Sequence, residues 1–151
     1  MALKYLIDTS VLHRLKSDEV LTKVRALTLN GEIARCSITD LEYLYSARNE
    51  VEWEGASHLL SRFFNIEVQP EHFMRALQVQ RILAQKSQRG RKIPDLIIAA
   101  VAEQLDLTLL HYDIDFDLIA EITGQRSEWI MPAGQISSRR WHEPAIRRHS
   151  F

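Results

Sequence analysis

Acidic residues at widely separated points of the chain are the groups best suited to chemistry. These are Asp8 after an apolar run, Glu42 in a short helical pattern, Asp95 after a proline and Asp113 after a second apolar run. Carboxylates that are brought together repel one another and stay ionised only beside a cation. A divalent metal ion is the simplest such cation, and ligand oxygens of this kind favour Mg²⁺ or Mn²⁺.

Most of these acids also have a purely structural explanation. Asp8 can cap a helix, and Asp95 can interact with the dipole of the helix that begins near Pro94. Asp113 and its neighbour Asp115 can accept hydrogen bonds from backbone donors in a turn. Taken singly, therefore, none of them identifies a site.

Glu42 is the hardest of the acids to explain as a structural residue. It borders a predicted apolar stripe on its helix, formed by Ile38, Leu41 and Tyr45. A charge beside buried surface is costly unless it is paired. Asp40 falls on another face of the same helix, where solvent or the helix dipole would account for it. We therefore favour Glu42 over Asp40 as a site residue.

Short apolar runs alternate along the chain with amphipathic segments, which predicts alternating strands and helices. We expect strands at about residues 3–7, 33–36, 66–68, 108–111 and 128–130. We expect helices at about residues 11–16, 17–29, 37–48, 52–64, 71–87, 94–105 and 116–123. Such alternation favours an α/β layer fold with a parallel sheet.

A parallel sheet would bring the acids together. The carboxyl ends of its strands lie along one edge, where ligands usually bind, and Asp8 and Asp113 directly follow strands. The chemistry expected of such a metal site is hydrolysis of a phosphodiester by an in-line displacement. Ser10, two residues after Asp8, could hydrogen-bond a carboxylate or a water molecule at the metal.

The composition excludes several other classes of protein. The chain has 151 residues, of which 46% are hydrophobic and 26% charged, with a net charge of −1, as expected for one globular domain. Its longest apolar stretch, residues 96–102, is far shorter than the roughly 20 residues that cross a bilayer. The start of the chain does not resemble a secretory signal, so we expect a cytoplasmic protein. The single Cys36 excludes an internal disulfide and a multi-cysteine zinc site.

The last residues differ in charge from the rest of the chain. We expect a nuclease-like domain over residues 1–137 and a basic, flexible tail over residues 138–151, which carries four arginines against one glutamate. Such a tail could contact nucleic acid or an acidic partner. A disordered end or a remnant of protein expression would explain it equally well.

Four short motifs carry the acids along the chain. They are Ile7-Asp8-Thr9-Ser10-Val11-Leu12, Ser37-Ile38-Thr39-Asp40-Leu41-Glu42, Pro94-Asp95-Leu96-Ile97-Ile98-Ala99-Ala100 and His111-Tyr112-Asp113-Ile114-Asp115-Phe116-Asp117. In this order and at these spacings they resemble the PIN-domain family, and most of all the VapC-type toxins of bacterial toxin–antitoxin pairs. The resemblance covers roughly residues 3–132.

The resemblance implies a three-layer α/β/α fold with a short parallel central sheet, and a Mg²⁺- or Mn²⁺-dependent endoribonuclease. The residues that match the catalytic and metal-binding acids of the family are Asp8, Glu42, Asp95 and Asp113. Asp115 matches a frequent fifth metal ligand, and Ser10 matches a small polar position near the first acid. His111 stands where the family often has threonine; at the end of a strand, a structural histidine is the better explanation.

The resemblance also implies partners. They are an RNA substrate, such as tRNA or rRNA, a second copy of the chain in a homodimer, and a cognate antitoxin protein. Arg89, Arg91 and Lys92 precede Asp95 and could bind RNA phosphates, contacts that position a substrate without reading its sequence. A solvated basic loop is an equally good explanation of these three residues.

Two other functions fit parts of the pattern. A catalytically silent PIN-like module that binds RNA or protein is the main alternative, but loss of the acids would be expected and all four are present. Hydrolysis of phosphomonoesters through an aspartate nucleophile is disfavoured, because that chemistry generally uses a second acid where Ser10 stands.

Overall fold

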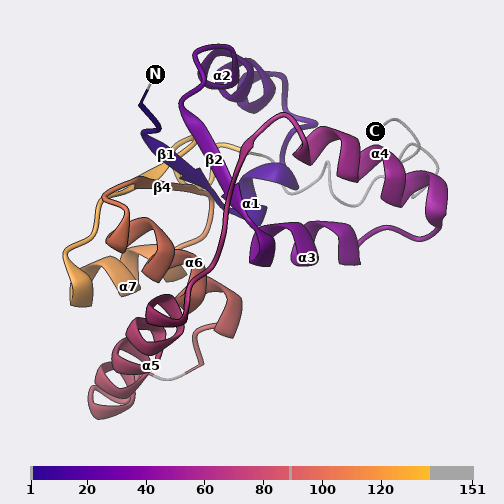
Figure 1. Cartoon of the computed structure of the whole chain (residues 1–151). Coiled ribbons are helices and arrows are strands. Elements are labelled where there is room, and N and C mark those ends of the chain that lie inside the picture. The colour runs from indigo at the N-terminus through magenta and orange to yellow at the C-terminus, as the bar shows by residue number, and fades with distance from the viewer. Residues whose placement is uncertain (1, 89, 137–151) are drawn as a thin grey trace.

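A five-stranded parallel sheet organises the described part of the chain, residues 2–88 and 90–136 of the computed structural model (Figure 1). The strands are β1 (Tyr5–Ile7), β2 (Ile33–Cys36), β3 (Phe64–Ile66), β4 (Thr108–His111) and β5 (Ser127–Trp129). Their order is β3-β2-β1-β4-β5, and each neighbouring pair is parallel. The predicted short parallel central sheet is confirmed.

The middle strand, β1, sits where the chain changes direction across the sheet. From β1 the chain moves outward through β2 to β3, and then returns to place β4 on the other side of β1. Leu6 is in register with Ala34 of β2 and with Leu109 of β4. Such a reversal of strand order opens a crevice at the carboxyl ends of the two central strands. Asp8 lies at this crevice, directly after β1, and its backbone N–H donates a hydrogen bond of 2.9 Å to the carbonyl of Leu110 in β4.

Helices cover both faces of the sheet and complete three layers. They are α1 (Thr9–Leu12), α2 (Asp18–Leu29), α3 (Ser37–Tyr45), α4 (Glu50–Leu60), α5 (Pro70–Gln85), α6 (Ile93–Gln104) and α7 (Asp115–Thr123). Leu6 and Leu109 pack with α5, α6 and α7, whereas Ile7 and Leu110 pack with α1, α2 and α4 (Figure 1). Successive strand residues face opposite sides of a sheet, so these short strands serve two cores. The predicted α/β/α arrangement is confirmed.

The buried face of α3 differs from the predicted stripe. Leu41 and Tyr45 are 69% and 91% exposed, and the helix instead buries Thr39 and Tyr43. The small Thr39 lets the helix approach β1 closely, and its hydroxyl donates to the carbonyl of Ile7 at 3.4 Å. The predicted stripe is therefore wrong for Leu41 and Tyr45, whereas Ile38 packs against the core as predicted.

The helices α4 and α5 also depart from the expected pattern. The segment predicted as a helix over residues 52–64 ends earlier, at Leu60, and the exposed Phe64 already belongs to β3. Along α5, the large apolar residues Phe73 and Leu77 are exposed, whereas Ala76, Val79 and Leu83 are buried. These buried residues of α5 pack in the same core cluster as residues of α6.

Two further features bear on the predicted organisation. No helix within residues 2–88 or 90–136 is long and apolar enough to span a bilayer. The basic segment 138–151 lies outside the described residues, so the division into a domain and a tail stays a prediction.

Candidate metal centre

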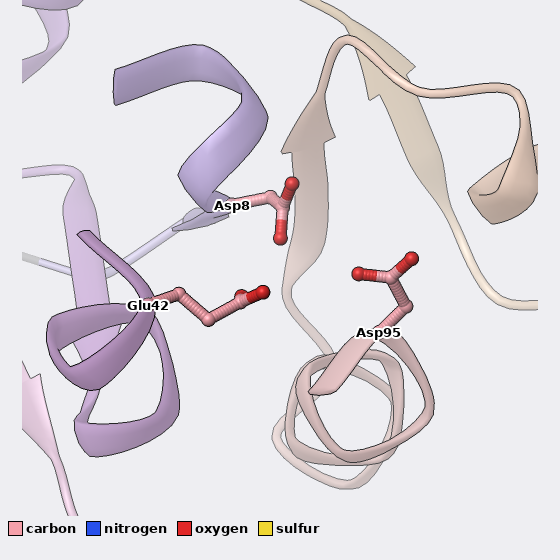
Figure 2. A group of neighbouring side chains, drawn as sticks. All are labelled: Asp8, Glu42 and Asp95. Carbon is pink, nitrogen blue, oxygen red and sulfur yellow. The ribbon is translucent and has the colours of Figure 1, made fainter. Parts of the chain in front are cut away.

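Carboxylates from separate elements converge at the carboxyl edge of the sheet. Asp8, Glu42 and Asp95 point into a common space (Figure 2), and one oxygen of each lies within 4.8 Å of the others. Asp95, Asp113 and Asp115 form a second such group with the same limit of 4.8 Å. Asp95 belongs to both groups. The structure thus brings together all the acids selected from the sequence.

Asp8 is held by the end of β1 and the start of α1. It caps α1, because its Oδ2 accepts the backbone N–H of Ser10 at 2.8 Å. The other oxygen, Oδ1, is buried and has no hydrogen-bond partner in the described part of the chain. The cap therefore accounts for only one of the two oxygens. A buried carboxylate oxygen without a partner is costly and favours a bound cation.

Glu42 reaches the same space from α3. Its Oε1 accepts the hydroxyl hydrogen of Thr9 at 2.9 Å, a contact between residues 33 positions apart. Asp40 of the same helix turns away and pairs with Arg35. Glu42 thus lies beside the other acids and Asp40 does not, although the apolar stripe used to choose between them was wrong.

Asp95 lies in the first turn of α6 and is only 4% exposed. A negative charge is favourable at this end of a helix. Its Oδ2, however, is buried without a hydrogen-bond partner among the residues described. The helix dipole alone leaves this oxygen unexplained.

Asp113 and Asp115 occupy the turn between β4 and α7. Oδ1 of Asp113 accepts the backbone N–H of Asp115 at 2.9 Å, and its Oδ2 lies 4.0 Å from Nζ of Lys92. Oδ1 of Asp115 pairs with Nη1 of Arg91 at 2.5 Å. Arg91, predicted to contact RNA, thus neutralises an acid of the site instead of facing outward. Arg89, the other arginine of that prediction, lies outside the described residues.

Burial and mutual repulsion change the acidity of two of these groups. Burial, and then the charges of Asp8, Asp113 and Glu42, raise the pKa of Asp95 to about 8. Burial raises the pKa of Asp8 to about 6, an effect opposed by hydrogen bonds from Ser10 and increased by Glu42. The acids cannot all be ionised at neutral pH without a cation among them. Unpartnered oxygens and raised pKa values fit a hard divalent ion such as Mg²⁺ or Mn²⁺.

The acids line one wall of a pocket of about 800 Å³. Lys92 lies on the same side, and Tyr112, Trp129 and residues 133–136 form much of the remainder. The hydroxyl of Tyr112 accepts the backbone N–H groups of Gly134 and Ile136 at 3.0 and 3.2 Å. The segment after β5 is thereby fixed beside the acids.

Two residues of the pocket were missed by the sequence interpretation. Thr9, which holds Glu42, was passed over in favour of Ser10. Arg14 lines the pocket with its guanidinium 4.5 Å from the centre of the Tyr112 ring, and its Nη1 donates to the Ser10 carbonyl at 2.8 Å. In the sequence, Arg14 could have been recognised as a pocket residue only by its spacing of four residues from Ser10, about one helical turn.

Ser10, predicted to support the acids, connects the two central strand ends. Its backbone N–H donates to Asp8, and its hydroxyl oxygen accepts the backbone N–H of Tyr112 at 2.9 Å. Tyr112 directly follows β4, so Ser10 sets the distance between the first acid and the turn that carries Asp113.

Comparisons with known proteins agree on one kind of protein. The family model described as PIN domain matches residues 5–122. Ribonuclease VapC51 of Mycobacterium tuberculosis is 57% identical over 136 residues, which are 90% of this chain and 99% of that relative. Ribonuclease VapC18 of the same organism is 38% identical over 135 residues, covering 87% of this chain and 98% of that protein.

Solved structures share the fold at lower sequence identity. The DNA-bound VapBC of Salmonella typhimurium superposes with a TM-score of 0.72 at 21% identity, covering 85% of this chain and 99% of that one. VapBC2 of Rickettsia felis, bound to a DNA fragment from its promoter, gives a TM-score of 0.71 at 22% identity, over 85% and 98% of the two chains.

Proposed function

The chain belongs to the PIN-domain family and to its VapC branch, and from this premise we propose that it is a metal-dependent endoribonuclease acting as the toxin of a toxin–antitoxin pair. One observation carries the proposal. Asp8, Glu42 and Asp95 each place a carboxylate oxygen within 4.8 Å of the others, and Asp8 and Asp95 each have a buried carboxylate oxygen with no hydrogen-bond partner in the described residues. Clustered, unpartnered carboxylates lower the stability of a fold, but they supply the oxygen ligands that Mg²⁺ and Mn²⁺ prefer.

Asp8, Glu42 and Asp95 would hold the ion, with Asp113 beside them and Asp115 as a further ligand when its pair with Arg91 opens. A bound divalent cation would activate a water molecule and neutralise charge that develops on the phosphate. Thr9 keeps Glu42 pointed at the other acids through its hydroxyl.

The basic groups of the pocket would position the RNA. Arg14 and Lys92 line the same pocket as the acids, where they would contact phosphates of the bound RNA. Contacts of this kind give affinity without reading sequence. Arg91 would contribute only after leaving Asp115, and Arg89 keeps the role predicted from the sequence.

The partners follow from the same premise. RNA is the substrate, with structured tRNA or rRNA as the expected targets in the cytoplasm, since the relatives are named ribonucleases. A cognate antitoxin is the expected inhibitor, because the structural neighbours are VapBC toxin–antitoxin assemblies. We also propose that the chain forms a homodimer.

The test is cleavage by the chain freed from any antitoxin. With Mg²⁺ or Mn²⁺ it should cut RNA internally, and EDTA should stop the reaction. Sequencing of RNA 5′ ends after induced expression would then identify the target. A chain that binds RNA but never cuts it, with any divalent ion, would instead support the silent binding module.

A further inference from the structure

His111 ends β4 directly before the turn that carries two of the acids. Its side chain is 0% exposed and lies between two aromatic rings, with centroid distances of 5.1 Å to Phe116 and 5.0 Å to Trp129. A polar ring in so apolar a place is costly unless its nitrogens are used.

One nitrogen of this ring has a defined partner. The backbone N–H of Asp113 donates to Nδ1 of His111 at 3.2 Å. A nitrogen that accepts a hydrogen bond carries no proton, so the proton of the neutral ring is on Nε2. Nε2 has no hydrogen-bond partner in the described ranges and lies 3.8 Å from Oδ1 of Asp117. The oxygens of Asp117 accept from Nε1 of Trp129 at 3.0 and 3.2 Å.

The turn after β4 is fixed by side chains at three of its backbone donors. The N–H of Tyr112 bonds to the Ser10 hydroxyl, that of Asp113 to the His111 ring and that of Asp115 to the Asp113 carboxylate. A buried backbone donor without a partner destabilises the conformation that contains it. Loss of the His111 acceptor would therefore release the turn at Asp113 itself.

We infer that His111 is a positioning residue, whose Nδ1 holds the turn so that Asp113 and Asp115 face Asp95. The inference rests on the proposed function, since it concerns acids assigned there to the metal. His111 touches neither metal nor RNA and acts through the backbone of Asp113. The acceptor atom is the feature that matters, not the bulk of the ring.

A pure packing role makes a different prediction, and two substitutions separate the two roles. His111→Asn places an amide oxygen near the position of Nδ1 but leaves much of the ring volume empty. His111→Leu fills more of the volume and offers no acceptor. If the acceptor matters, asparagine preserves metal binding and leucine weakens it; if packing matters, leucine is the better replacement.

The measurement is Mn²⁺ affinity of the full chain by titration calorimetry. We expect His111→Leu to weaken Mn²⁺ binding by about tenfold, the lower end of the loss typical for groups that orient metal ligands. His111→Asn keeps an acceptor and should weaken Mn²⁺ binding much less than His111→Leu. Val20→Ala is the control, because Val20 is a fully buried core residue of α2 that does not line the pocket of the acids. It should lower thermal stability without changing Mn²⁺ affinity.

A second measurement does not depend on any variant folding. In the ¹⁵N spectrum of the parent chain, Nδ1 of His111 should be unprotonated and Nε2 protonated. A protonated Nδ1, or equal Mn²⁺ affinity in the parent and His111→Leu, would overturn the inference while leaving the nuclease proposal intact. A parent chain that binds no Mn²⁺ would overturn both.

Discussion

The hydroxyl of Thr9 donates a hydrogen bond of 2.9 Å to Oε1 of Glu42, so the residue after the first acid holds the second one. Thr9 is buried, and Glu42 arrives from a helix that packs across the end of β1. The contact orients a carboxylate that would otherwise be free to turn toward solvent. It also leaves the other carboxylate oxygen of Glu42 available to a cation.

Thr9→Val should reduce Mn²⁺ affinity and RNA cleavage by about tenfold, because it removes the hydroxyl and keeps the shape of the side chain. Thr9→Ser keeps the donor and should retain most of both. Calorimetry with Mn²⁺ and a cleavage assay on the same preparations measure the two effects. Equal affinities for the valine and serine variants would show that this hydrogen bond does not orient Glu42 for metal binding.

The metal-free chain should become less stable as the pH rises through 7 to about 8. The pKa of Asp95 is raised to about 8, so the folded chain keeps a proton that the unfolded chain has already released. The free energy of unfolding then falls with rising pH until Asp95 ionises. His111 contributes a change of stability in the opposite direction, because burial lowers its pKa to about 4. That change takes place below pH 7, outside the range in which Asp95 is measured. Denaturant unfolding between pH 7 and pH 8.5 in EDTA measures the slope.

Asp95→Asn isolates this contribution. The variant should show a flatter pH profile than the parent and should be more stable than the metal-free parent at pH 8.5. Addition of Mn²⁺ should stabilise the parent and leave the variant almost unchanged. Parallel profiles for the two chains would mean that Asp95 does not titrate in this range.

Asp113→Asn should weaken Mn²⁺ binding more than Asp115→Asn. Asp115 already has a cation beside it in Arg91, whereas Asp113 is 4.0 Å from Lys92. We expect the Asp115 variant to lose about tenfold in Mn²⁺ affinity, the lower end of the loss typical for a residue that supports a ligand set, and the Asp113 variant to lose more. Arg91→Gln should increase the contribution of Asp115 to Mn²⁺ affinity, because it removes the cation that pairs with this carboxylate. A larger loss for Asp115→Asn would place Asp115 among the principal ligands.

Removal of residues 138–151 should leave the cleavage step intact. The acids, and the basic groups of the pocket within the described residues, precede this segment. Single-turnover cleavage with the chain in excess over RNA measures the step without product release. A large loss of rate in a truncated chain with a normal thermal transition would show that the segment belongs to the site.

Much of the site could be predicted because strand ends are local features. Asp8 and Asp113 follow apolar runs, and the order of strands in a parallel sheet leaves their carboxyl ends on one edge. Asp95 was marked by Pro94 at the start of an apolar helix. The positions of these acids could be predicted from the alternation of strands and helices alone, and that alternation is clear in the sequence.

Side-chain partners could not be predicted in the same way. The pairing of Arg91 with Asp115 and the bond from Thr9 to Glu42 join residues 24 and 33 positions apart, and they depend on how helices sit against the sheet. The buried faces of α3 and α5 also differ from those that apolar spacing alone would favour. Thr39 and Ala76 are buried because small residues allow close approach, whereas an apolar pattern favours large ones.

The central claim is that acids from separate elements hold one divalent cation at the carboxyl edge of the sheet. Anomalous diffraction from crystals of the chain grown with Mn²⁺ tests it most directly. We predict a strong Mn²⁺ peak enclosed by Asp8, Glu42 and Asp95, and its loss in Asp95→Asn crystals. A well-ordered pocket with no peak at saturating Mn²⁺, or a peak that persists in Asp95→Asn, would contradict the account.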